Sequence, residues 1–359
     1  MFGAAATGAS IALSLYEAHI LADKQVSYSR RKAYYAAKKR HPLMSYQGVI
    51  SAVDRFNTQG LIEHFKQTPG QRGWQSWMAA KPELIAGVQT ILAKAPKMRL
   101  ILPREPIILR DSNGVTIPTK QTRDLDRMQR RIEQFNEGIT SLEIVGDKVV
   151  SLAAPLVRIF NGDLGRGGRF YASGISWQNV KADMRKRIVI DGEQVVELDF
   201  SSLHPAMLYA EAGAEMPADC YDISPWPRDL VKLGVLVLIN AKTQHQARSA
   251  IAHKPVIAAL AQPGSQQALR LVQELIDDIK RIHKPIARAF HSDAGARLMR
   301  RDSELAERVM MLLAHQGVIA LPVHDSFLVP ASKRGQLKVA MLEAAHAIGL
   351  HQICVKANA

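Results

Sequence analysis

The sequence predicts an α+β fold with a mainly helical, basic N-terminal region. Hydrophobic residues recur with helical spacing in several charge-laced segments. Short, mostly apolar runs bounded by turn residues alternate with these segments and indicate strands. The chain has 359 residues, 47% hydrophobic and 22% charged, which is enough for a large core. We expect a boundary near residue 140, separating regions 1–140 and 141–359.

Composition narrows the functional classes. Lys and Arg number 47 against 33 Asp and Glu, a formal net charge of +14, so a polyanionic partner is expected. Two cysteines, Cys220 and Cys354, are too few for a disulfide framework or a thiolate zinc site, which indicates a reducing compartment, the cytoplasm by default. Residues 1–21 are apolar, but Glu17 and His19 interrupt them, so no signal peptide is expected. No apolar run approaches the roughly 18 to 20 residues that span a bilayer.

The N-terminal region opens with a basic segment. Residues 24–40 contain seven cations and no acid, with Tyr28, Tyr34 and Tyr35 interleaved. Cations and flat aromatic faces suit a nucleic-acid backbone and its bases, although a solvated helix face has the same pattern. Residues 45–92 read as helices broken at Thr68-Pro69-Gly70 and Lys81-Pro82, and the Gly-rich turn before Trp74 and Trp77 suggests a small helix-turn-helix or winged-helix unit. This region is expected to serve as a thumb-like, template-gripping or docking module.

Strands and a hairpin are expected next, followed by a helix. The apolar runs 100–103 and 106–110 read as strands, and Asp111-Ser-Asn-Gly114 reads as a turn. Charge-laced residues 121–139 return to helical periodicity.

The C-terminal region differs from the N-terminal region in its residue composition and pattern. Residues 164–177 are rich in Gly, Arg and aromatics, and 195–200 form a short strand-like run. Residues 224–240 suit a helix with Ser224 as N-cap and Pro225 in the first turn, although Val235, Val237 and Ile239 also fit a strand. Helices are predicted at 266–286 and 303–316, and a hairpin of two apolar runs around a polar centre at 317–330.

Two of the apolar runs contain an aspartate. Asp199 lies in Val195–Phe200, and Asp325 lies in the centre of the 317–330 hairpin. Because an isolated ionised carboxylate in an apolar setting is costly, each aspartate needs a positive partner. One interpretation is that each pairs with a nearby Arg or caps a turn. The other is that both bind Mg²⁺, or Mn²⁺, as two ions suited to in-line attack at phosphorus.

Arg228 and Lys232 lie between the two aspartates in sequence. Four residues apart, they project from one face of a helix and can grip a triphosphate. A spacing of four between two cations is common in a basic chain. It indicates a phosphate site here only because the pair lies between the two aspartates in the sequence.

These segments together resemble the family A polymerases. Val196-Glu-Leu-Asp-Phe-Ser-Ser-Leu-His-Pro205 resembles motif A of that family, and Arg228-x3-Lys232-x7-Asn240-Ala241 resembles motif B of the fingers helix. Val323-His-Asp-Ser-Phe327 resembles motif C, in a form closer to the single-subunit phage-type RNA polymerases. Gly168-Arg-Phe-Tyr-Ala-Ser173 with Trp177-Gln-Asn179 is similar to the segment that touches primer and template. The likeness covers about residues 165–335 and implies a right-hand palm of antiparallel strands with helical fingers.

The resemblance also implies residue roles. Asp199 and Asp325 would bind two Mg²⁺ ions that activate the primer 3′-hydroxyl and steady the pyrophosphate. Arg228 and Lys232 would contact the triphosphate, with Lys232 a candidate proton donor to the leaving group, and Phe200 would belong to the nucleotide site. The nucleic-acid contacts would come from a further group of residues, namely Arg169, Gln178, Asn179 and His324.

Two positions depart from the family pattern. His204 stands where the DNA polymerases have Glu and the RNA polymerases have Gly, at the place that discriminates the sugar. It can exclude a 2′-hydroxyl by its bulk or bind one by a hydrogen bond. Asn240-Ala241 replaces Tyr-Gly, so the ring that checks the nascent base pair is lost and modest fidelity is expected. No ordered carboxylate set for a proofreading nuclease is found in residues 1–140.

The leading hypothesis is a minimal template-directed nucleotidyltransferase that binds a DNA template-primer and nucleoside triphosphates as a monomer. A DNA polymerase is favoured over a single-subunit RNA polymerase or primase. The template is expected to be DNA, with RNA as the alternative. The hypothesis from another class is a non-catalytic DNA-binding replication or regulatory protein, and a degenerate polymerase fold kept for interactions is a third reading. The compactness suggests a bacterial or phage-type setting, such as a mobile element.

Overall fold

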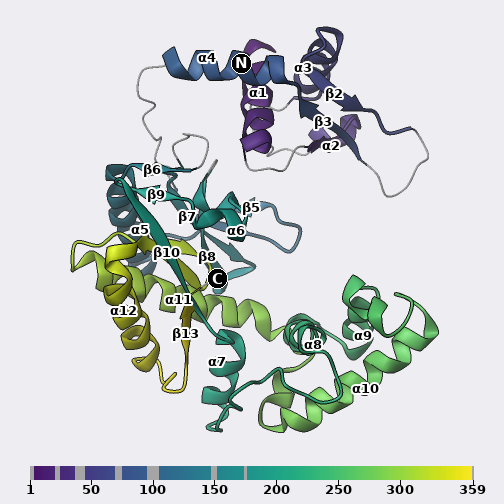
Figure 1. Ribbon diagram of the computed structural model, residues 1–359, viewed down its shortest axis with the longest axis vertical. Helices are drawn as coiled ribbons and strands as arrows, with labels where there is room; N and C mark the ends of the chain where they lie inside the picture. Colours follow the sequence, from purple (N-terminus) through teal and green to yellow (C-terminus); the bar gives the residue numbers. More distant parts are fainter. Residues whose placement is uncertain are drawn as a thin grey trace.

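The computed structural model describes residues 4–20, 25–36, 45–68, 75–94, 105–146, 152–173 and 176–357. They form a mixed α+β protein, as the sequence predicts (Figure 1). Several expectations lie outside the described residues: the strand at 100–103, the Pro69-Gly70 turn, Trp74, and part of the basic segment (Lys24 and Lys38–Arg40). Among the described residues, no helix has both the length and the apolar character needed to cross a bilayer.

The described residues up to Lys94 form helices around a small sheet. In chain order these elements are α1 (Ala4–Ile20), β1 (Val26–Tyr28), α2 (Lys32–Ala36), α3 (Tyr46–Thr58), β2 (Ile62–Phe65), β3 (Ser76–Ala80) and α4 (Pro82–Lys94). The strands pair antiparallel in the order β1-β3-β2. The expectation of helices throughout 45–92 is therefore wrong over β2 and β3. Buried Ile62 and Met78 face the core from two paired strands, so cross-strand burial overrides the helix propensity of Met78-Ala79-Ala80.

A second sheet has four strands in the order β5-β4-β7-β8. They are β4 (Ile107–Arg110), β5 (Thr116–Ile117), β7 (Leu156–Asn161) and β8 (Asp163–Ala172). The hairpin predicted around Asp111–Gly114 is confirmed, because β4 and β5 pair antiparallel on either side of it. The Asp111 side chain stabilises the turn by accepting hydrogen bonds from the Asn113 and Val115 N–H groups. The parallel pairing of β4 with β7 joins segments that are far apart in sequence.

A third sheet has the order β11-β12-β10-β9-β6, with β13 also pairing β10, and all its pairs are antiparallel. Its strands are β6 (Ile144–Val145), β9 (Val189–Ile190), β10 (Glu193–Phe200), β11 (Leu321–Val323), β12 (Ser326–Pro330) and β13 (Val355–Ala357). The predicted strand at 195–200 and the predicted hairpin at 317–330 are both confirmed. They pair with each other as β10 and β12, which brings the two aspartate-bearing segments together.

Helices and short 3-10 turns cover these sheets. The helices are α5 (Arg123–Ser141), α6 (Ala182–Arg185), α7 (Leu203–Glu211), α8 (Arg228–Asn240), α9 (Gln244–Ala252), α10 (Gln266–Ile282), α11 (Ala294–Ala314) and α12 (Arg334–His346), and the 3-10 turns are Trp177–Asn179, Pro255–Ala259, Lys284–Ala289 and Ala331–Lys333. The helices predicted at 121–139, 266–286 and 303–316 are thus confirmed, although 3-10 turn Lys284–Ala289 replaces the last turn expected after α10.

The start of α8 differs from the prediction. Its N-cap is Pro227 rather than Ser224, and the Ser224–Pro225 peptide bond is cis. Pro227 is the reason, because a proline disfavours helical backbone at the residue before it, here Trp226. Residues 235–239 are helical, so the strand alternative for them is wrong.

Buried hydrophobic side chains form two clusters. The smaller one draws only on residues 11–92, and the larger one draws on residues 107–355. Helix α5 belongs to the larger cluster through Leu125, Ile132 and Ile139. A division at residue 140 therefore cuts through the larger core, and the two cores separate between Leu92 and Ile107.

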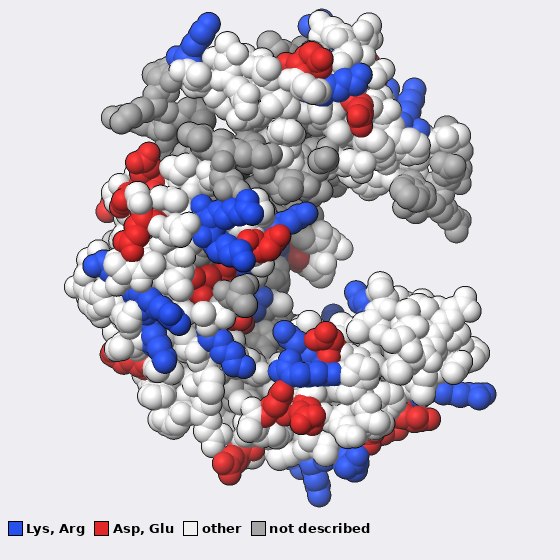
Figure 2. Space-filling view, in the orientation of Figure 1, with Lys and Arg blue, Asp and Glu red and all other residues white. Residues whose placement is uncertain are grey.

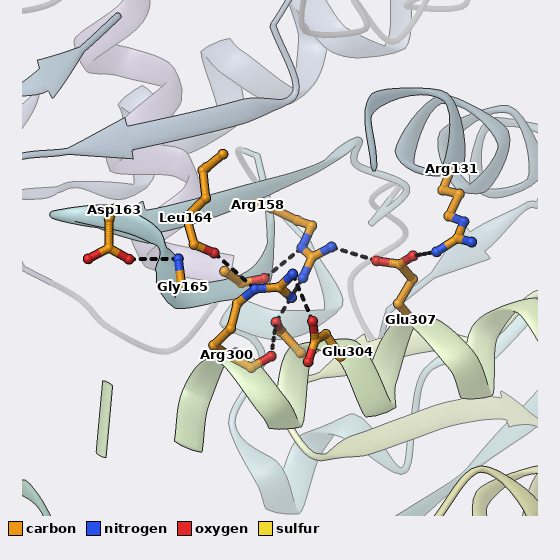
Figure 3. A network of polar contacts seen from close by, with 10 residues as sticks. Arg131, Arg158, Asp163, Leu164, Gly165, Arg300, Glu304 and Glu307 are labelled. Carbon is orange, nitrogen blue, oxygen red and sulfur yellow. Dashed lines mark hydrogen bonds and ion pairs between the residues drawn. The ribbon is translucent and has the colours of Figure 1, made fainter. Parts of the chain in front are cut away.

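A buried polar network holds α11 on the second sheet (Figure 3). Arg158 of β7 is fully buried and donates to Glu307 at 2.5 Å, to Ser303 at 2.8 Å and to the Gly168 carbonyl at 2.7 Å. Arg131 of α5 also pairs with Glu307. Because a buried charge needs close partners, this network fixes the position of α11, which carries further residues toward the candidate site.

Candidate active site

The two aspartates singled out in the sequence lie on adjacent strands. Asp199 stands near the end of β10, opposite Ser326 of β12 and Lys356 of β13. Asp325 directly precedes Ser326 in the tight turn between β11 and β12, and the Phe200 N–H donates to its carbonyl oxygen at 3.4 Å. Both aspartates line one cavity of about 410 Å³.

The electrostatic setting of Asp199 is unusual. Burial, and after it the nearby Asp325 and Glu197 carboxylates, raise the pKa of its carboxyl to about 7, while Lys232 acts in the opposite direction. Its Oδ1 atom is buried and has no hydrogen-bond partner among the described residues. A deprotonated Asp199 is therefore under-compensated by the protein alone.

Glu197 shows the contrasting case on the same strand face. It lies two residues before Asp199, and its side chain accepts hydrogen bonds from Arg185 at 2.8 Å to each oxygen and from the Ser326 hydroxyl at 2.6 Å. Glu197 is thus neutralised within the protein. The pairing of Arg185 with Glu197 was not predicted from the sequence.

The residues present fit a divalent cation bound together with phosphates. Within the described ranges, no group of three or more His, Cys, Asp or Glu is arranged to hold a metal ion. Mg²⁺ commonly takes only one or two carboxylates and completes its shell with water and substrate phosphates. Asp199 and Asp325 would supply those carboxylates, and the orphaned Oδ1 atom of Asp199 is the oxygen that a cation would compensate.

Helix α8 supplies two cations to the same cavity. Arg228, its first residue, is about half exposed, donates to both Asp219 oxygens at 2.7 and 3.1 Å, and lies 5.2 Å above the Tyr221 ring. Lys232, one turn later, is exposed and also lines the cavity. The cavity therefore combines two acids with two cations, which suits a ligand carrying several phosphates.

His204 is held by a buried carboxylate that the sequence did not reveal. Its Nε2 atom lies 3.0 Å from Oδ2 of Asp302 on α11, whose side chain is 1% exposed. Arg169 of β8 donates to both oxygens of the same carboxylate, at 3.2 and 2.9 Å from its Nε atom. An ionised carboxylate only accepts hydrogen bonds, so Nε2 of His204 carries the proton. Arg169 and His204 both line the cavity.

The other sequence candidates divide into two groups. Phe200 and Asn240 line the cavity, and Asn240 donates to the Leu236 carbonyl at 2.8 Å. A second group lies outside the set that lines it: Gln178, Asn179 and His324.

Each member of this second group has its own contacts. Gln178 bonds with backbone groups of β8 and donates to the Pro322 carbonyl, so it ties β8 to β11. Asn179 accepts a hydrogen bond from the Ser176 hydroxyl. His324 packs edge-on against Tyr171, and burial lowers the pKa of its imidazole.

Several residues that line the cavity or lie beside it were not predicted from the sequence. Lys356 reaches the cavity from β13 near the C-terminal end, and Tyr221 from the segment between α7 and α8. Asp302 lies inside a charged helical stretch of ordinary appearance. For Glu197 the period of two along β10 was a usable signal, because it places Glu197 on the same face as Asp199.

The molecule also has a larger hollow. Figure 2 shows the molecule hollowed on one side, between the lobe of α8, α9 and α10 and the rest of the chain, with Lys and Arg side chains along its walls. A surface of this shape and charge suits a bulky polyanion.

Comparison with solved structures gives structural likenesses, among them one to a POL domain. The POL domain of Pol1 from M. smegmatis, solved with DNA primer-template and dNTP, aligns with a TM-score of 0.38 and 12% sequence identity. The alignment covers 97% of this chain and 65% of the solved chain. No protein-family model matches the sequence. No curated protein matches it either.

Proposed function

We propose that this protein is a template-directed nucleotidyltransferase that transfers a nucleotide from a nucleoside triphosphate to a primer 3′-hydroxyl. The observation that carries the proposal is the shared cavity of Asp199, Asp325, Arg228 and Lys232. The under-compensated Asp199 and its neighbour Asp325, in one cavity with two cations, are suited to hold divalent ions and a triphosphate together.

Mg²⁺ bound at the two aspartates would supply Lewis-acid activation of the 3′-hydroxyl and charge stabilisation at phosphorus. Asp199 and Asp325 would orient the reacting groups. Lys232 would hold the triphosphate and donate a proton to the departing pyrophosphate. Arg228 would exchange its Asp219 partner for a phosphate, which its exposed position allows.

Within this class, we favour a DNA polymerase without proofreading over an RNA polymerase or primase. The support is His204, a bulky side chain held rigidly by Asp302 at the cavity wall, which suits exclusion of a 2′-hydroxyl. Asn240 offers no aromatic ring to the cavity, so modest fidelity is expected. Misincorporation assays on Asn240→Tyr test this reasoning, and an unchanged error rate would contradict it.

Single-nucleotide extension of a primed DNA template tests the proposal. The wild-type protein should extend the primer with Mg²⁺ and dNTPs, and more slowly with NTPs. Asp199→Ala and Asp325→Ala should abolish extension while primer-template binding remains, and Asp222→Ala, which removes an exposed acid, should extend normally. A wild-type protein that binds DNA but extends no primer with either nucleotide would favour the non-catalytic DNA-binding protein instead.

A further inference from the structure

The N-terminal elements follow the order of a winged-helix unit. A helix, a strand, two helices and a two-stranded hairpin succeed each other as α1, β1, α2, α3, β2 and β3, and β1 pairs with β3 to complete the sheet. Figure 1 shows α2, α3, β2 and β3 together at one side of α1. In helix-turn-helix units of this kind, the second helix of the pair, here α3, is the one that enters a groove of DNA.

Helix α3 is amphipathic in the way this role requires. The Ser45 side chain caps its first turn by accepting from the Gly48 N–H at 3.0 Å. Val49 and Val53 are buried against the small core. On other sides of the helix, Gln47 and Arg55 are exposed and able to donate hydrogen bonds. The helix thus presents polar donors to the outside while its apolar side fixes it to the unit.

Cations gather at one end of the small sheet. The register pairs Tyr28, the last residue of β1, with Ser76, the first of β3, and pairs Phe65, the last of β2, with Trp77. The chain therefore leaves β1 and β2 at the same end of the sheet, where four cations follow directly: Arg30, Arg31, Lys32 and Lys66. Arg31, Lys32 and Lys66 are exposed.

This cationic end lies beside α3. Arg30 donates to both oxygens of Asp54 on α3, at 2.8 and 3.0 Å, which lowers the pKa of that carboxyl, and Lys66 contributes in the same direction. Arg30 thereby neutralises the acid on this part of α3. Arg31, Lys32 and Lys66 form no ion pair with the residues that the structure describes, and Tyr34 on α2 adds an aromatic ring that is 45% exposed.

We propose that this unit is a second nucleic-acid site, which binds double-stranded DNA through α3 and through Arg31, Lys32 and Lys66 on the phosphates. The major groove of B-form DNA admits an α-helix, whereas the major groove of A-form RNA is too deep and narrow. The site is built on the smaller core and shares no residue with the acidic cavity. It holds duplex DNA that need not contain a primer end.

Binding of a DNA duplex without free ends tests this site separately from the catalytic site. The probe is a short DNA duplex sealed by a loop at each end, so that it offers no 3′-hydroxyl, and binding to the full-length protein is followed by fluorescence anisotropy across a salt series. The triple variant Arg31→Glu, Lys32→Glu, Lys66→Glu should bind this probe at least about tenfold more weakly. Its slope of log affinity against log salt should be shallower by up to about 3, since each phosphate contact contributes about 0.9.

The matched control is Lys333→Glu, Arg334→Glu, Lys338→Glu, which makes the same charge change on exposed cations at and before α12. It should bind the closed duplex like the wild-type protein. The N-terminal variant should keep the urea midpoint of the wild-type protein and still extend a primed template when the template is saturating. Asp199→Ala should keep its affinity for the closed duplex, so loss of the proposed catalysis leaves this test intact.

Three outcomes would overturn the proposal: no binding of the closed duplex by the wild-type protein, equal loss in both triple variants, or binding of a closed RNA duplex as tight as that of DNA.

Discussion

Replacing Asp199 by Asn should make the metal-free protein more stable at neutral to alkaline pH, although it should abolish nucleotide transfer. The reason is that burial, with Asp325 and Glu197 nearby, opposes the ionised form of Asp199. The amide keeps the shape of the side chain and removes the charge. A residue that lowers stability in the free protein is expected where a site is built to bind a cation.

The size of the effect follows from the pKa. Asp199 titrates near 7 in the folded protein against 3.8 as its ordinary value. At about 1.36 kcal/mol per pKa unit, the ionised side chain costs at most about 4 kcal/mol, and solvent screening of a side chain that is not fully buried brings the expected gain to about 2 kcal/mol.

The sign of the pH dependence is fixed by linkage. Between the two pKa values the folded state holds a proton on Asp199 that the unfolded state has released. Stability of the wild-type protein therefore falls as pH rises through the window from about 4 to about 7. The advantage of Asp199→Asn should be near zero at about pH 4 and complete at about pH 8.

Urea unfolding in the presence of a chelator, at both pH values, measures this difference. Asp222→Asn is the control, because Asp222 is exposed, and it should not reproduce the gain. Adding Mg²⁺ at pH 8 should stabilise the wild-type protein more than the variant, since a ligand that binds the folded state raises its stability. An advantage of equal size at both pH values, or none at pH 8, would refute the electrostatic reasoning.

Three further predictions concern the surrounding residues. Arg158→Met should lower the free energy of unfolding in urea by about 3 to 5 kcal/mol, because it leaves the buried Glu307 carboxylate with a weaker partner. A decrease below about 1 kcal/mol would contradict the role of the network. Lys232→Met should lower the rate of single-nucleotide extension by about a hundredfold without changing the circular dichroism spectrum, and an unchanged rate would exclude proton donation. Asp302→Asn should release His204 and change the ratio of kcat/KM for dNTP and NTP by about tenfold, and an unaltered ratio would separate His204 from sugar selection.

Elements with a strong local pattern were predictable from the sequence. The periodicity of α5, α10 and α11 identified these helices, and the aspartates inside apolar runs marked β10 and the β11–β12 turn. The small sheet was missed because β2 and β3 are short, and their burial depends on β1 and the helices packed around them. The start of α8 was misplaced by three residues, since two prolines compete for the role of helix start.

The residues of the candidate site, too, were only partly predictable from the sequence. Asp199, Asp325, Arg228 and Lys232 were identified from residue type and order along the chain. Asp302 and Lys356 were not, because nothing in their neighbours along the chain indicates what they face. For Glu197 the period of two along β10 indicates the face that it shares with Asp199, but not its pairing with Arg185. Arg169 and Gln178 were identified as nucleic-acid contacts, yet the structure gives each of them protein partners, Asp302 for the first and backbone carbonyls for the second.

The sequence by itself determined the local elements, the excess of positive charge and the presence of carboxylates in apolar strands, since these depend on composition and on spacing over a few residues. Only the tertiary structure decided that Glu197 is neutralised by Arg185 while Asp199 keeps an unpartnered oxygen. Two acids in one strand thereby acquire different chemistry. Desolvation and Coulomb interaction depend on distance and burial in space, and chain order alone does not specify either.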